Sequence, residues 1–108
     1  MNMFVVNGNV WRLFFVDPSD SELQRSDGSY TLGVTDRNTR CVYLNNRLYG
    51  YMLDKVLCHE VCHVYFFEYG YDLDIETEEL LCDFVATYGR DIFKTADALL
   101  GIVNRIAK

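Results

Sequence analysis

Two histidines and a glutamate form a short motif near the middle of the chain. His59, Glu60 and His63 stand in the segment His-Glu-Val-Cys-His, and the chain of 108 residues has only 2 histidines. Residues four apart on an α-helix differ by about 40° around its axis, so both imidazoles can reach one ion. Neutral imidazole is a favoured zinc ligand. The spacing therefore predicts a zinc site held by His59 and His63.

Glu60 follows the first histidine directly and has a different place in this prediction. It lies about 100° around the helix from His59, close enough to contact a water on the metal but poorly directed as a ligand. Zinc lowers the pKa of a bound water towards about 7, and an adjacent carboxylate can then take its proton. We expect Glu60 to be the general base of peptide-bond hydrolysis.

A catalytic zinc normally takes a third protein ligand, which must come from outside the motif. Glu68 projects about 140° away from His63 on the same helix, so we expect it to face elsewhere. Glu79 and Asp83 are four residues apart and share a helix face. This spacing favours Glu79 as the ligand and Asp83 as an acid that hydrogen-bonds to a ligating imidazole.

Other residues in the same segment leave alternatives for the third ligand. Glu76 lies seven residues before Asp83 and can reach the same side, and a cysteine such as Cys82 is also a chemically suitable donor. Glu78 is expected to be a solvated residue of the first helical turn. Tyr65, Tyr69 and Tyr88 are candidates for stabilising the oxyanion of hydrolysis, and spacing selects none of them.

The second half of the chain has the period of helices. Gly70 is expected to end the motif helix, and Asp74 to cap a second helix that Gly89 closes. A third helix is expected from Asp91 to Ala107. The motif helix has one face with steps of three and four residues, formed by Met52, Val56, His59, His63 and Phe66.

The first half of the chain has the pattern of strands. Phe4 to Val6 and Val10 to Val16 are β-prone runs joined by Asn-Gly-Asn, a hairpin signal. Two more strands are expected near Tyr30 to Val34 and Arg40 to Leu44. Strands followed by helices predict one α+β domain over residues 1–108, with a small antiparallel or mixed sheet and packed helices.

Composition narrows the class of protein. Half of the residues are hydrophobic, enough for a core, and the formal net charge of −6 disfavours nucleic acid and acidic membranes as partners. The first residues resemble no secretion signal and no run is long enough to span a bilayer, so we expect a cytoplasmic protein. The 4 cysteines are accordingly expected to be reduced.

Beyond this chemistry, the sequence resembles zinc peptidases of the gluzincin type, in which a His-Glu-x-x-His helix precedes a helix with Glu-x-x-x-Asp. Glu79-Leu-Leu-Cys-Asp83 fits the second motif, and Asp83-Phe-Val-Ala follows the pattern of the ImmA/IrrE-like metallopeptidases. Segments 33–36 and 41–44 are similar to that family's strand pair. The resemblance covers about residues 31–88. It implies a zincin-like fold and a peptide or protein substrate.

Two other interpretations remain open at the level of sequence. In one, the domain binds zinc but is a catalytically inactive regulatory or interaction module, since so short a chain has few residues to wall a peptide cleft. In the other there is no metal, and both histidines belong to the core of a small binding protein. Metal content separates the last interpretation from the others, and Glu60→Gln separates an enzyme from a module. Oligomeric state is left open.

Overall fold

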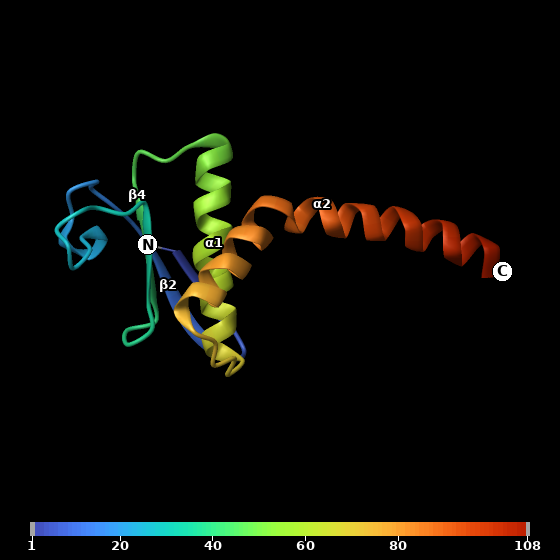
Figure 1. Ribbon diagram of the computed structural model, residues 1–108, viewed down its shortest axis with the longest axis horizontal. Helices are drawn as coiled ribbons and strands as arrows, with labels where there is room; N and C mark the ends of the chain where they lie inside the picture. The colour runs from blue at the N-terminus through green and yellow to red at the C-terminus, as the bar shows by residue number, and fades with distance from the viewer. Residues whose placement is uncertain (1, 108) are drawn as a thin grey trace.

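The computed structural model describes residues 2–107 and has strands first and helices afterwards (Figure 1). The strands form one sheet, and α1 lies along it. α2 then crosses α1 and runs on to the C-terminus. The elements in chain order are β1 (Asn2–Val6), β2 (Asn9–Val16), a short 3₁₀ helix η1 (Ser21–Leu23), β3 (Gly33–Asp36), β4 (Cys41–Asn45), α1 (Gly50–Glu68) and α2 (Ile75–Ala107).

The sheet is mixed, with strand order β1-β2-β4-β3. β1 and β2 form the expected hairpin, in which Asn7 and Gly8 have φ of 50° and 78° and Val6 pairs with Asn9. Positive φ at both turn residues matches the right-handed twist of the strands. β2 pairs with β4 in parallel, and β3 pairs with β4 antiparallel. The α+β class with a mixed sheet is confirmed, and β3 forms one edge.

The core lies between the sheet and one face of α1. Trp11 of β2, Val42 and Leu44 of β4 and Val64 of α1 are fully buried and belong to one hydrophobic cluster. Val64 directly follows His63, so the packing of this face fixes the rotation of α1. The motif side chains on the adjoining face are thereby held in one direction.

Glu68 ties the last turn of α1 to the sheet. Its carboxylate accepts hydrogen bonds from Asn9 Nδ2 at 2.6 Å, Trp11 Nε1 at 2.9 Å and Arg40 Nε at 2.8 Å. The hydrogen bond from Arg40 is the largest cause that lowers the pKa of Glu68. The prediction that Glu68 faces away from the histidines is confirmed, and its role is structural.

The connection from α1 to α2 follows the local signals. α1 ends at Glu68, Gly70 has a φ of +72°, and Tyr71 N–H donates to the Phe66 carbonyl at 3.0 Å, as in a helix C-cap. Asp74 Oδ2 accepts from Thr77 N–H at 3.2 Å just before α2 begins. Both predicted boundaries are confirmed.

The prediction of two helices after Asp74 is wrong, because α2 runs unbroken for 33 residues from Ile75 to Ala107. A helical glycine costs only about 1 kcal/mol relative to alanine, and no proline follows Gly89. Gly89 therefore weakens the helix without ending it. The later part of α2 projects away from the rest of the molecule (Figure 1). The whole molecule, α2 included, measures 57 Å along its longest axis.

The predicted strand from Tyr30 to Val34 is also shifted. β3 begins at Gly33, and Tyr30 instead forms an isolated antiparallel bridge with Gln24. Residues before Gly33 thus close a loop over η1, whose Leu23 is fully buried.

Among residues 2–107, neither helix combines the length and apolar character that a membrane crossing requires.

Candidate metal centre

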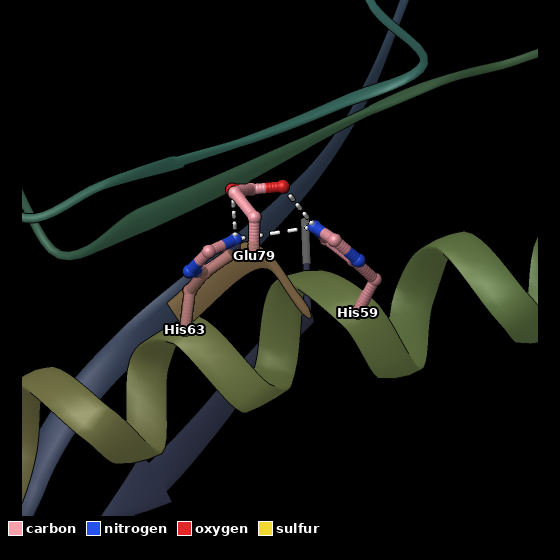
Figure 2. A group of neighbouring side chains, drawn as sticks. All are labelled: His59, His63 and Glu79. Atoms are coloured by element: carbon pink, nitrogen blue, oxygen red, sulfur yellow. Dashed lines mark hydrogen bonds and ion pairs between the residues drawn. The ribbon is translucent and has the colours of Figure 1, made fainter. Parts of the chain in front are cut away.

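Three side chains from the two helices converge at one point (Figure 2). His59 and His63 project from α1, and Glu79 projects from α2 between them. Their ligand atoms all lie within 4.8 Å of one another. Glu79 lies 2.7 Å from His63 Nε2 through one carboxylate oxygen and 3.1 Å from His59 Nε2 through the other. The two Nε2 atoms are 3.1 Å apart.

These distances suit a small divalent ion. Ligand atoms about 2.0–2.1 Å from a tetrahedral zinc lie about 3.3 Å from one another. The three separations in the cluster are 2.7 to 3.1 Å, somewhat shorter than that value, and the two that involve Glu79 use different oxygens. Two imidazole nitrogens and one carboxylate oxygen are also a donor set of the kind that catalytic zinc sites use. The cluster could therefore hold a metal ion with little rearrangement.

The other nitrogen of each imidazole is bonded to a second acid. His59 Nδ1 lies 2.8 Å from Asp83 Oδ1, and His63 Nδ1 lies 2.5 Å from Glu78 Oε2. In a neutral imidazole, an Nδ1–H that donates to a carboxylate leaves Nε2 as an acceptor. In that tautomer, two acceptor nitrogens and a carboxylate face one another. Such an arrangement is stabilised by a cation.

Glu78 is the clearest departure from the sequence-based prediction, which placed it in solvent. Its side chain is only 2% exposed, and the carboxylate oxygen that contacts His63 also lies 2.6 Å from Arg37 Nη2. Burial of an acid is costly unless it is paired, and here both partners supply N–H donors. Glu78 thus holds His63 in orientation. Its neighbour Glu79 is 47% exposed and faces the shared point.

Glu60 lies on the sheet side of α1 and is buried. The hydroxyl of Thr35 on β3 lies 2.9 Å from Glu60 Oε1 and 3.0 Å from the Glu60 carbonyl, so it can donate to either. Burial raises the pKa of Glu60, and the Thr35 hydrogen bond partly opposes this. A raised pKa brings a carboxylate closer to the range in which a general base works best. The sequence pattern had not singled out Thr35.

Close packing of β3 against α1 keeps this carboxylate in place. Gly33 begins β3, and a Cβ built on it would lie 2.9 Å from both Glu60 Cγ and Val56 Cγ1. Real Cβ atoms do not approach other atoms so closely. The absence of a side chain at Gly33 therefore allows β3 to reach Glu60.

The alternative ligands lie outside the cluster. Glu76 is exposed in the first turn of α2, and Cys82 is fully buried. The neighbouring Cys82 thiol lowers the pKa of Cys62. Within residues 2–107 all 4 cysteines are free thiols, and none joins the group at His59.

A hollow of about 680 Å³ opens on the cluster. Residues of β3, α1 and the start of α2 line it, among them Val34, Arg37, Glu60 and Ile75. None of the three tyrosines proposed for the oxyanion lines it. Tyr65 and Tyr69 line a separate hollow, and Tyr88 packs against Phe84 with a centroid distance of 5.3 Å.

Comparisons with protein-family models, with curated proteins and with solved structures found no match to this chain.

Proposed function

We propose that this chain is a zinc-dependent peptidase that hydrolyses peptide bonds of a peptide or protein substrate. The observation that carries the proposal is the convergence of His59 Nε2, His63 Nε2 and a Glu79 oxygen, with both Nδ1 atoms bonded to other acids. A cation satisfies this group of acceptors, and nitrogen and carboxylate donors favour zinc.

Each residue of the site has its own role in the proposed reaction. Bound zinc would supply a Lewis acid for the scissile carbonyl and a lowered pKa for a water. Glu60 would be the base that accepts the proton of the attacking water, and Thr35 positions the Glu60 carboxylate through the 2.9 Å hydrogen bond. Asp83 and Glu78 orient His59 and His63, which keeps both Nε2 lone pairs directed at the same point.

The arrangement of the elements supports a zincin-like fold as part of this proposal. The helix with His-Glu-x-x-His packs beside an edge strand and is followed by the helix with Glu-x-x-x-Asp, as the resemblance to ImmA/IrrE-like peptidases implies. β3 is an outer strand of the sheet that residues 2–107 form, and its edge is where an extended peptide can add as a further strand. We also propose that the protein is located in the cytoplasm.

Metal analysis of the purified chain tests the metal site first. We expect about one zinc per chain, as the three converging ligands require, and loss of that zinc in His59→Ala and in His63→Ala. The two variants remove one ligand each and leave the other donors in place. An unmodified protein that takes up no zinc when zinc is supplied contradicts the proposal.

The Glu60→Gln variant tests catalysis separately from metal binding. The amide has nearly the same shape as the carboxylate but cannot accept the proton of the water, so we expect full zinc content and no hydrolysis. A set of quenched fluorescent peptides serves as the assay. Undiminished hydrolysis by the variant excludes Glu60 as the base.

An inactive zinc-binding module is the second candidate, and one observation favours it. α2 projects from the domain with large apolar side chains exposed, such as Phe93 at 67% and Ile106 at 79%, as expected of a helix that binds a partner. In that case the unmodified protein and Glu60→Gln hold zinc equally and neither cleaves any peptide.

A further inference from the structure

A second hollow adjoins the metal centre, lined by α1, the start of α2 and the segment that leads into β3. It has a volume of about 430 Å³ and shares His59, Glu60 and Glu79 with the candidate centre. The rest of its lining includes apolar and cationic side chains. Leu32, Met52 and Val56 supply apolar surface there, and two cationic side chains, Arg25 and Lys55, supply charge.

The acidic and the cationic side chains of this hollow have different partners. Its three acids are engaged at the metal end, where Glu60 pairs with Thr35, and Glu79 and Asp83 contact the histidines. In residues 2–107, no carboxylate lies within ion-pair distance of Arg25 or Lys55. Arg25 is near enough to Asp27 to contribute to the lowered pKa of that acid, but neither Arg25 nor Lys55 forms an ion pair among the described residues.

Arg25 is held at the hollow by an ordered loop. Gln24 and Tyr30 pair across the loop, and Arg25 N–H donates to the Ser29 carbonyl at 2.7 Å. The guanidinium donates to Thr31 Oγ1 at 3.3 Å, and Thr31 also lines the hollow. A guanidinium has five N–H donors, so most of them are free for a ligand.

Lys55 approaches from the other side. It lies on α1 one turn before His59, and residues four apart share a helix face. Lys55 is partly buried and lines the hollow, as expected of a side chain whose stem packs on apolar surface while its ammonium group stays in contact with water. An anion in the hollow can thus contact the planar guanidinium group of Arg25 and the ammonium group of Lys55.

We infer that this hollow receives an acidic side chain of the substrate, a glutamate in preference to its neutral amide, next to the bond that is hydrolysed. The inference rests on the proposed function, because the hollow opens on the candidate zinc site. The methylene groups of a glutamate fit against Met52 and Val56, and its carboxylate reaches Arg25 and Lys55. Charge-assisted hydrogen bonds of this kind distinguish an acid from an amide by about 10-fold in affinity.

Peptide hydroxamates test this inference, since the hydroxamate group binds zinc while the neighbouring side chain samples the hollow. Four matched compounds carry glutamate, glutamine, leucine or lysine at that position. Their dissociation constants are measured by calorimetry with the zinc-loaded full chain. We expect the glutamate compound to bind about 10-fold more tightly than the glutamine compound, and the lysine compound to bind least tightly.

Variants then assign the preference to its residues. Arg25→Gln and Lys55→Gln should each reduce the glutamate-to-glutamine ratio by several-fold while zinc content and binding of the glutamine compound stay unchanged. Arg12→Gln is the matched control. Arg12 is exposed on β2, lines neither hollow at the metal centre and loses the same charge, so the ratio should not change.

The outcomes separate this inference from the proposed function. If zinc and all four hydroxamates bind but glutamate has no advantage over glutamine or leucine, the inference is overturned and the peptidase proposal stands. A ratio that survives loss of both Arg25 and Lys55 overturns it as well. A chain that binds no zinc overturns the proposed function and the inference together.

Discussion

Glu78 Oε2 lies 2.5 Å from Nδ1 of His63, and the two side chains are 2% and 8% exposed. A buried acid beside a candidate metal ligand fixes the ring orientation and the tautomer of that ligand. Arg37 shares the same oxygen at 2.6 Å and balances the charge of the acid. The pair links the start of α2 to the motif helix.

This contact predicts that Glu78→Gln weakens zinc binding by about 10- to 100-fold, because the amide no longer holds the imidazole as a charged acceptor. Competition with a chromophoric chelator measures the change. Glu76→Gln is the control, since Glu76 is exposed in the same helical turn and its loss should leave the affinity unchanged. Equal affinities of the Glu78 and Glu76 variants contradict an orienting role for Glu78.

The third ligand is tested by a ranking of four variants in the same competition assay. Glu79→Ala should weaken zinc binding most, because it removes the oxygen that lies 2.7 Å from His63 Nε2. Asp83→Ala should weaken it by about 10- to 100-fold through its effect on His59. Glu76→Ala and Cys82→Ala should have little effect. If Cys82→Ala proves the most damaging, the site contains a thiolate and the peptidase proposal loses its main support.

Thr35→Val tests the positioning of the base. Valine has the shape of threonine but cannot donate the 2.9 Å hydrogen bond to Glu60, so we expect kcat to fall by about 10-fold with zinc affinity unchanged. Thr35→Ser keeps the hydroxyl and should restore most of the rate. A valine variant with normal kcat shows that Glu60 needs no such support.

Gly33→Ala tests the close approach of β3 to α1. The new methyl group would lie 2.9 Å from Glu60 Cγ and Val56 Cγ1, and we expect a loss of about 1–3 kcal/mol in the free energy of unfolding. Gly101→Ala is the matched control, because an added Cβ there meets nothing within 4 Å and should stabilise α2 by up to about 1 kcal/mol. Urea denaturation compares the two. A Gly33 variant as stable as the unmodified chain contradicts the tight contact.

Glu68 predicts a pH dependence of stability. Its pKa in the folded state is below the ordinary value of 4.5, chiefly through the hydrogen bond from Arg40. A lowered pKa stabilises the folded state fully above pH 4.5, and this contribution is lost as pH falls through the folded-state value. Glu68→Gln should therefore lower stability near neutral pH, and the difference from the unmodified chain should shrink below pH 4.5. Urea denaturation across this range checks it, and a difference independent of pH contradicts it.

Local signals in the sequence were sufficient to predict several features of the fold. The Asn7-Gly8 turn, the end of α1 at Gly70 and the cap of α2 at Asp74 all depend on residues within one or two turns of each other. The four-residue spacing of His59 and His63 likewise places both rings on one side of α1 without reference to the rest of the chain. Such features follow from local backbone geometry and do not depend on contacts between distant segments.

The docking of α2 on α1 decided what the sequence left open. Glu78 and Glu79 are adjacent in the chain and lie about 100° apart around α2, so the crossing of the helices determines which acid is buried and which faces the shared point. Contacts that join Thr35 to Glu60 and Arg37 to Glu78 span 25 and 41 residues. The unbroken course of α2 through Gly89 was also missed. The sequence by itself therefore determined that His59, His63 and Glu60 share one side of a helix, while packing between distant elements decided which acids surround the histidines, because no local rule fixes the angle at which two helices meet.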